Sequence, residues 1–282
     1  MSVLPGAEPF LFEHALTGTG QRTAESATNA SEAASTVAPV QVGVVLCHGF
    51  TGSPQSLRPW GEYLRDAGFI VHCPRLPGHG TRWQDMNATR WEDWYGELER
   101  ALDEMLARVD TVFGMGLSMG GTLVTRLAQE RGDDLAGIVL VNPSYLTLRR
   151  DAVLLPALSR VLGSVPGVAN DIKKPGAVEL AYDRTPLKAA YSLNQLWRIV
   201  RSDLHKVSIP IRLYHSADDH VVEPVNARVL LDGVSSGDVQ EIVLTDSYHV
   251  ATLDNEAERI FAGSVSFVNE LTTHLLDPEQ PR

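Results

Sequence analysis

The stretch Gly116-Leu117-Ser118-Met119-Gly120 stands between the apolar run 111–113 and the amphipathic stretch 123–128. A strand, a sharp turn flanked by glycines and a helix are the parts of a nucleophile elbow, which exposes a reactive serine at the edge of a sheet. Because the chain has 23 glycines in 282 residues, such a pentapeptide also arises by chance. The strand and the helix expected on either side of it are therefore the stronger indication of an elbow. The alternative is an ordinary strand-to-helix turn. The setting predicts that Ser118 is a nucleophile.

From Val40 onward, short apolar runs rich in β-branched residues alternate with amphipathic stretches. This alternation is typical of a mostly parallel, doubly wound α/β sheet with helices on both faces. The predicted strands are residues 7–12 (an edge strand), 42–47, 69–73, 111–114, 137–141, 211–214 and 241–244. The predicted helices are residues 53–67, 91–107, 118–131, 187–200, 224–231 and 255–275.

Residues 144–206 break this alternation, because they contain no convincing strand and far exceed the length of a crossover. We predict that they form a cap over the carboxyl end of the sheet, where ligands bind in α/β folds. Extra structural helices packed elsewhere are the alternative. Residues 1–143 and 207–282 would form the core. Residues 17–39 are poor in large apolar side chains, and we expect a flexible insertion there.

The composition restricts the ligand and the compartment. With 24 basic and 35 acidic residues the net charge is −11, which disfavours nucleic acid and anionic membranes as partners. Cys47 and Cys73 each end an apolar run and are predicted to be buried thiols in a reducing compartment. The start of the chain lacks the pattern of a secretory signal, and no apolar run is long enough to span a bilayer. We therefore expect a soluble, cytoplasmic protein without stable membrane insertion.

The histidine that serves Ser118 is sought downstream of it. A serine hydroxyl needs a general base, the base needs an orienting carboxylate, and an elbow of this kind has the order serine, acid, histidine. His249 lies in a polar loop between the last strand and the last helix, on the same side of the sheet as the elbow. We predict it as the general base. The other histidines that follow the serine are His205, His215, His220 and His274.

The carboxylate is sought in the loop that follows strand 211–214. This loop offers two adjacent candidates, Asp218 and Asp219, and one of them should face the imidazole. It would hold the histidine tautomer and stabilise the imidazolium without taking the proton itself.

The oxyanion of a tetrahedral intermediate needs backbone donors. The N–H of Met119, directly after the nucleophile, is the first candidate. The second is the N–H of Phe50, in the glycine-rich loop after strand 42–47. The further glycine-rich loop 77–80 lacks the lysine and hydroxyl of a phosphate-binding loop and is expected to shape the site. No histidine and cysteine spacing indicates a metal site, so no metal or cofactor is expected.

Taken together, several segments resemble the bacterial monoacylglycerol lipases and their carboxylesterase relatives. They are residues 47–54, 74–80, 116–121, 219–222 and 247–254, and the resemblance covers nearly the whole chain from Val40 onward. It implies an α/β-hydrolase fold with a small cap inserted after the sixth strand. In hydrolases of this kind an aspartate followed by one variable and two aliphatic residues is the catalytic acid, which implies Asp219 and leaves Asp218 to cap its loop.

The resemblance extends into residues 167–173 and 178–182. It implies that Val168 and Glu179 contact the glycerol portion of a monoacylglycerol, which the enzyme would cleave to glycerol and a free fatty acid. The implied partner is a small-molecule lipid ester, with transient lipid-surface contact through the cap. The chain departs from the family pattern in residues 17–39 and 147–164.

Three other functions fit parts of this pattern. A general carboxylesterase acting on short- to medium-chain acyl esters would use the same catalytic residues. Other serine chemistry on this fold includes thioester cleavage and perhydrolase activity. A ligand receptor without catalysis belongs to a different class, and an intact Ser118, Asp219 and His249 argues against it.

Overall fold

The computed structural model describes residues 2–13 and 40–276. Within them a seven-stranded sheet has the order β1-β3-β2-β4-β5-β8-β9. Only β1 runs antiparallel to its neighbour, pairing Phe10 with Cys73. The parallel strands therefore bring their carboxyl ends to one edge. The strands are β1 Phe10–Phe12, β2 Val42–Cys47, β3 Ile70–Cys73, β4 Thr111–Leu117, β5 Gly137–Val141, β8 Ile211–Ser216 and β9 Val239–Leu244.

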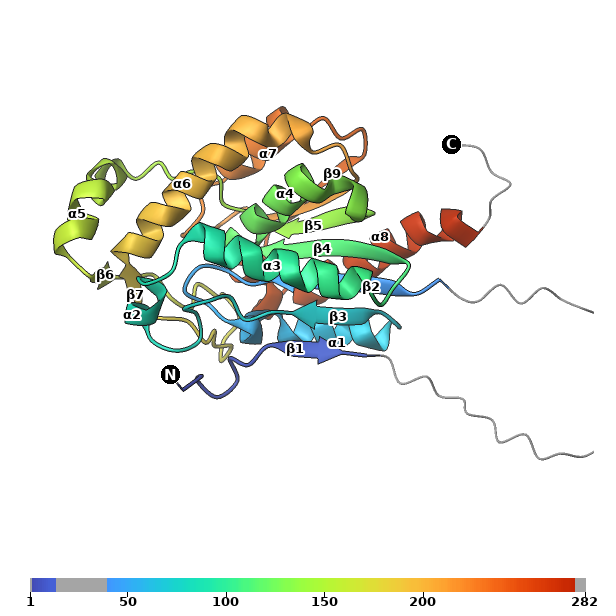
Figure 1. Ribbon diagram of the computed structural model, residues 1–282, viewed down its shortest axis with the longest axis horizontal. Helices are drawn as coiled ribbons and strands as arrows, with labels where there is room; N and C mark the ends of the chain where they lie inside the picture. The colour runs from blue at the N-terminus through green and yellow to red at the C-terminus, as the bar shows by residue number, and fades with distance from the viewer. Residues whose placement is uncertain (1, 14–39, 277–282) are drawn as a thin grey trace, which may run out of the picture.

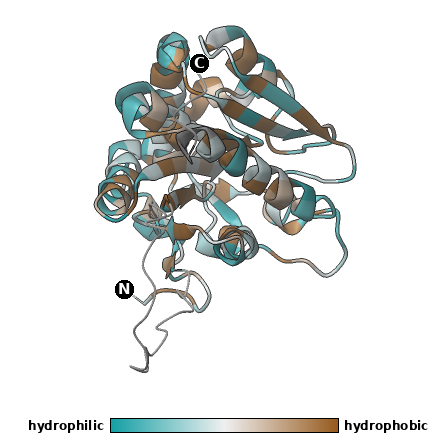
Figure 2. Ribbon diagram, turned by 90° about the vertical axis from the view of Figure 1, so that its right-hand side faces the viewer, coloured by the Kyte–Doolittle hydropathy of each residue, from teal (hydrophilic) through white to brown (hydrophobic). Residues whose placement is uncertain are grey.

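Helices cover both faces of this sheet (Figure 1). One hydrophobic cluster joins α3, α4 and α6 to the sheet, and a second joins α1 and α8 to its other face. Figure 2 shows apolar strands in the middle of the molecule, between helices that carry both apolar and polar residues. The helices are α1 Arg58–Asp66, α2 Trp83–Met86, α3 Trp91–Leu106, α4 Met119–Arg131, α5 Leu155–Val161, α6 Leu187–Asp203, α7 Val225–Gly233 and α8 Ala257–Leu276.

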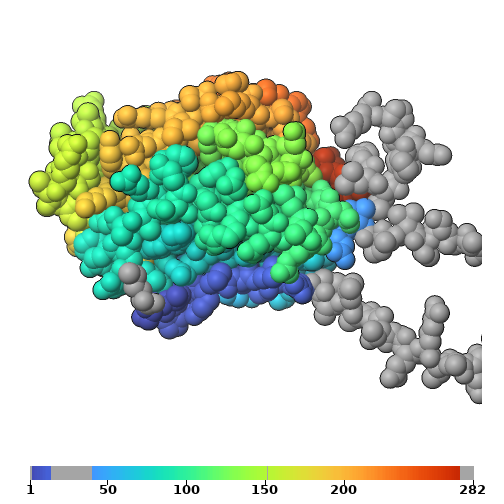
Figure 3. Space-filling model, viewed as in Figure 1, coloured from blue at the N-terminus to red at the C-terminus, as the bar shows by residue number. Residues whose placement is uncertain are grey.

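Within the segment 144–206, α5, β6 (Ser164–Pro166) and β7 (Arg184–Pro186) lie at one end of the molecule, and α6 runs back from there along the core helices (Figures 1 and 3). The expectation that the segment lacks strands is wrong, because β6 and β7 form a separate antiparallel pair. Strands of three residues carry too few side chains to show an alternating pattern. The segment follows β5, the fifth strand along the described chain, rather than a sixth.

The beginning of this segment is tied to the core next to the predicted acid. Oδ1 of Asn226 accepts the N–H groups of Tyr145 and Leu146, at 2.6 and 2.9 Å. Oε1 of Glu223 accepts the N–H of Leu148 at 2.8 Å. These bonds fix the entry of the chain into the segment against the region that follows β8.

The main differences in strand boundaries have a local cause. β4 extends to Leu117, beyond the predicted end at residue 114. The prediction was too short because the glycines at 114 and 116 interrupt the apolar pattern. A Cβ at Gly116 would lie 2.5 Å from backbone atoms of Gly120, so packing requires the glycine. The predicted insertion 17–39 lies outside the described residues.

The cysteines and the helices can be compared with what the composition predicts. Cys47 and Cys73 are free and fully buried, as the sequence predicts. No helix among the described residues combines the length and apolar character needed to cross a bilayer.

Candidate active site

Ser118 occupies a strained turn between β4 and α4. Its φ of 56° and ψ of −121° are unusual for a residue with a side chain. The turn is held by the N–H of Ser118, which donates to the carbonyl of Val141 at 2.9 Å. Gly120 allows the turn, because a Cβ there would lie 1.9 Å from the carbonyl oxygen of Cys47. The backbone thus places the Ser118 hydroxyl at the carboxyl edge of the sheet.

The structure brings Ser118, His249 and Asp219 together. Oγ of Ser118 lies 2.9 Å from Nε2 of His249. Nδ1 of His249 lies 2.7 Å from Oδ2 of Asp219. The histidine and aspartate side chains are only 9% and 2% exposed, so both hydrogen bonds are shielded from water. This geometry allows proton transfer from the hydroxyl to the imidazole.

Asp219 also caps its own loop, a role that was expected of Asp218. Its Oδ1 accepts the N–H groups of Val221 and Val222 at 2.8 and 2.7 Å. The prediction that Asp218 caps this loop is wrong. Asp218 is 65% exposed and lies 3.5 Å from Nε2 of His220. A single carboxylate has two oxygens, which lets Asp219 bind the loop and the imidazole together.

The charges around His249 oppose the effect of burial. Burial alone would lower the pKa of His249, but the hydrogen-bonded carboxylate of Asp219 raises it. Glu179 and Asp171 add to this effect, so the pKa of His249 lies above its ordinary value of 6.5. For Asp219, burial acts to raise the pKa, yet His249 and the loop N–H groups hold it below the ordinary value. The pair therefore favours a charged aspartate beside an imidazole that readily accepts a proton.

The loop after β2 lies against the nucleophile. A Cβ at Gly49 would lie 3.4 Å from Cβ of Ser118 and 3.9 Å from its Oγ. The backbone N–H groups of Phe50 and Met119 have no acceptor among residues 2–13 and 40–276. Two N–H groups without a protein acceptor beside a serine hydroxyl are suited to a developing oxyanion.

His48 holds this loop in place. Its Nδ1 lies 3.0 Å from the carbonyl oxygen of Gly49, and its Nε2 accepts the N–H of Leu76 at 3.2 Å. Burial lowers the pKa of His48 to about 4, which keeps the ring neutral. His48 is therefore a structural support for the Phe50 loop.

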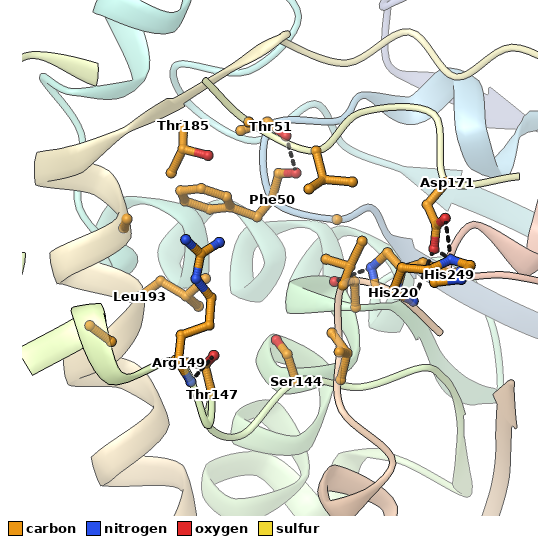
Figure 4. A pocket seen from close by; sticks show the side chains of 18 of the residues that line it. Phe50, Thr51, Ser144, Thr147, Arg149, Asp171, Thr185, Leu193, His220 and His249 are labelled. Atoms are coloured by element: carbon orange, nitrogen blue, oxygen red, sulfur yellow. Dashed lines mark hydrogen bonds and ion pairs between the residues drawn. The ribbon is translucent and has the colours of Figure 1, made fainter. Parts of the chain in front are cut away.

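Ser118 and His249 line a pocket of about 430 Å³, and Figure 4 shows part of it with His249 labelled. Val168 and Glu179 both line it, and Val168 is 59% exposed. Burial raises the pKa of Glu179, against the opposing effects of His249 and the Asn170 backbone. The apolar part of the lining includes Leu146, Leu155, Leu158, Leu187, Leu193 and Trp197.

Two residues that hold the His249 loop were not predicted from the sequence. Asn142 directly follows β5, with a φ of 44°, and its Nδ2 donates to the carbonyl of His249 at 2.7 Å. Its Oδ1 accepts the N–H of Ser216 at 2.7 Å. A polar residue at the carboxyl end of a central strand is the signal that identifies it. Asp171 accepts the N–H of His249 at 3.1 Å, and no local pattern marks it.

In the part of the chain that the structure describes, no three histidine, cysteine, aspartate or glutamate side chains are arranged to hold a metal ion.

The fold and the site together define the class of protein. A mostly parallel sheet with a serine elbow, a histidine after the last strand and an aspartate after the preceding one is the α/β-hydrolase arrangement. The chain is a serine hydrolase of this fold. More particularly, it belongs to the serine aminopeptidase S33 family, whose sequence pattern matches residues 38–256.

Individual relatives agree with this assignment. The chain is 39% identical over 233 residues to a thermostable monoacylglycerol lipase of Bacillus sp. (strain H-257), covering 80% of this chain and 90% of the relative. It is 24% identical over 233 residues to a carboxylesterase of Bacillus subtilis (strain 168), covering 81% and 92%. A solved structure from work on the metagenome-derived lipolytic enzymes LipS and LipT matches with a TM-score of 0.84 and 34% identity, covering 95% of this chain and all of that one.

Proposed function

We propose that this enzyme hydrolyses monoacylglycerols to glycerol and a free fatty acid. The observation that carries the proposal is the carboxyl group of Glu179 in the same pocket as Ser118 and His249. A carboxylate accepts hydrogen bonds, so it suits the free hydroxyls of a glycerol leaving group. A site of this kind rejects esters whose alcohol lacks hydroxyls, because its buried polar group is then left unpaired. The monoacylglycerol lipase relative supports the same substrate.

The proposed reaction proceeds through an acyl-enzyme. Ser118 attacks the ester carbonyl while His249 takes its proton, and Asp219 stabilises the resulting imidazolium. The oxyanion accepts hydrogen bonds from the N–H groups of Phe50 and Met119. His249 then protonates the departing glycerol oxygen. Water, activated by the same histidine, cleaves the acyl-enzyme and releases the fatty acid.

A general carboxylesterase acting on short- to medium-chain acyl esters is the second candidate. It is favoured by the pocket volume of about 430 Å³, which is toward the lower end of the range of about 300–1,000 Å³ for small-molecule sites. It is also supported by the carboxylesterase relative.

Replacing Glu179 with alanine tests the assignment of the alcohol. Glu179→Ala should lower kcat/KM on a monoacylglycerol at least about tenfold more than on the methyl ester of the same fatty acid. The methyl ester is the matched control because only the alcohol differs. Ser118→Ala should abolish both activities. Equal losses on the two esters would contradict the role of Glu179, and faster cleavage of short aryl esters than of monoacylglycerols would favour the carboxylesterase.

We further propose that residues 144–206 act as a cap that makes transient contact with lipid surfaces. Support comes from exposed apolar side chains of this segment, among them Leu148, Val153, Leu154, Val161 and Leu162. Val153 and Val161 are 78% and 77% exposed. Val153→Asp with Val161→Asp should reduce co-sedimentation with vesicles of zwitterionic phosphatidylcholine. Unchanged binding would contradict the proposal.

A cytoplasmic location is also proposed. It is supported by the free thiols of Cys47 and Cys73, which suit a reducing compartment. Fractionation of the source cells with an antibody against the chain tests it, and recovery from the culture medium would contradict it.

A further inference from the structure

Asp171 connects the segment between β6 and β7 to both loops that carry the predicted acid and base. Its Oδ2 accepts the N–H of His249 at 3.1 Å and the N–H of His220 at 3.3 Å. Its Oδ1 lies 2.8 Å from Nδ1 of the His220 ring. Its backbone carbonyl accepts the N–H of Val250 at 3.1 Å. Figure 4 shows Asp171 beside both histidines at one side of the pocket.

The carboxylate is enclosed rather than solvated. Its side chain is 11% exposed, while the ring of His220 is 50% exposed and packs edge-on against Tyr248 at 4.5 Å between centroids. A carboxylate in such a place is stable only when its lone pairs are satisfied by donors. Each bond to Asp171 therefore also fixes the donor, and two of the donors are the backbone of His249 and of the residue after Asp219.

A second carboxylate, that of Asp254, connects the same two regions from the side of the core. Asp254, in the core, accepts the N–H groups of Lys173 and Lys174, both at 2.8 Å. It also accepts the N–H of Tyr248 at 2.8 Å. On the other side of Asp171, Oδ1 of Asn170 accepts the N–H of Glu179 at 2.8 Å. The short run 170–174 thus joins the proposed alcohol-binding glutamate to the loop that carries His249.

We propose that Asp171 is a positioning residue for hydrolysis, which fixes the His249 loop and the Asp219 loop relative to each other from outside the sheet. In this role its carboxylate binds the backbone N–H groups of His249 and His220 and the ring of His220, not the reacting atoms. The inference rests on the proposed catalytic roles of Ser118, Asp219 and His249. A displacement of about 1 Å between reacting groups can cost on the order of 100-fold in rate, so such a support bears directly on kcat.

The charges facing these groups determine the expected pH response. His220 faces the carboxylates of Asp171, Asp218 and Asp219, and Asp171 raises the pKa of its ring most strongly. His249 faces Asp219, Glu179 and Asp171. Neutralising Asp171 removes one charge that favours the imidazolium of His249. The acid limb of the activity profile should therefore move to lower pH.

Asp171→Asn tests the inference, with Asp218→Asn as the matched control. Both substitutions remove one negative charge next to His220, but among the described residues the loop N–H groups bond to Asp171 and Asp219 and none bonds to Asp218. Initial rates on 4-nitrophenyl butyrate give kcat and KM across the pH range for wild type, both variants and Ser118→Ala. The low-field proton signal of the His249 to Asp219 hydrogen bond is recorded by NMR for each variant.

For Asp171→Asn we expect kcat to fall about 10- to 100-fold with little change in KM, an acid limb at lower pH, and a shifted or lost low-field signal. Asp218→Asn should leave all three as in wild type. Wild-type kcat in Asp171→Asn, or equal effects of both variants, would overturn the inference. If Asp171→Asn does not fold, His220→Phe tests the inference instead, because it removes the bond between the His220 ring and Asp171. In this variant kcat should fall severalfold at constant KM, and an unchanged kcat would overturn the inference. A wild type that cleaves neither 4-nitrophenyl butyrate nor a monoacylglycerol would instead refute the proposed function.

Discussion

A Cβ atom on Gly120 would lie 1.9 Å from the carbonyl oxygen of Cys47, so the start of α4 is in direct contact with the end of β2. This contact brings the turn at Ser118 against the loop that contains Phe50. The two N–H groups proposed to bind the oxyanion belong to these two segments, Met119 to the start of α4 and Phe50 to the loop after β2. The geometry of the site thus depends on a position where no side chain fits.

Gly120→Ala should strongly destabilise the protein. The added methyl group meets backbone atoms, which cannot move aside as a flexible side chain would, and we expect a loss of about 3 kcal/mol or more in the free energy of unfolding. Urea unfolding of the variant measures it. Gly96→Ala is the control: no heavy atom beyond its chain neighbours and the adjacent backbone of its own helix lies within 4 Å of a Cβ placed there, and alanine should stabilise by up to about 1 kcal/mol. Wild-type stability in Gly120→Ala would contradict the close approach.

Asp219→Asn should lower kcat by about 10³- to 10⁴-fold, because an amide cannot stabilise the imidazolium and favours the wrong tautomer of His249. Steady-state kinetics on a soluble ester measure the loss. Asp218→Asn should retain nearly full activity, since the exposed carboxylate of Asp218 does not contact His249. A comparable loss in both variants would refute the assignment of the acid.

The pH dependence of activity should follow the titration of His249. The imidazole must be neutral to accept the proton of Ser118, so kcat/KM should fall as the pH decreases through the pKa of His249, which lies above 6.5. Because the charge of Glu179 helps to raise that pKa, Glu179→Gln should move the midpoint to lower pH. A methyl ester is the substrate for this measurement, since its alcohol needs no contact with Glu179. A midpoint that stays in place or moves upward would be inconsistent with this coupling.

The thiols of Cys47 and Cys73 should react very slowly in the native protein. Both are fully buried, and burial raises the pKa of each thiol well above its ordinary value, so almost no thiolate forms. Dithionitrobenzoate should label neither cysteine in native conditions and both in guanidinium chloride. Rapid labelling without denaturant would show that the regions around β2 and β3 open readily.

The sequence predicts the elements of the parallel sheet because buried strands show continuous apolar runs. β2 and β5 have the predicted boundaries, whereas β4 was predicted too short because glycines interrupt its pattern. The strands β6 and β7 were missed, since three residues carry almost no periodic signal. Their pairing joins residues 18 to 22 positions apart, which no local pattern reveals.

The site could be read from the sequence where its residues belong to recognisable motifs. Ser118, Asp219 and His249 each follow a strand, and the fold brings them to one edge. The resemblance pointed to Asp219 as the acid, but the capping of the loop by the same residue could not be read, because it depends on the direction of each side chain. Asp171 could not be found either, since its importance comes from contacts with loops 49 and 78 residues away along the chain.

The attachment of residues 144–206 has an evolutionary consequence. Asn226 and Glu223 bind the chain at Tyr145, Leu146 and Leu148, and the next firm connection to the His249 and Asp219 loops is Asp171. Between these anchors lie α5 and β6, and here the chain can gain, lose or exchange residues without displacing the reacting groups. Since α5 and β6 contribute to the pocket lining, changes there are expected to alter which ester fits while the bond-cleaving groups keep their places.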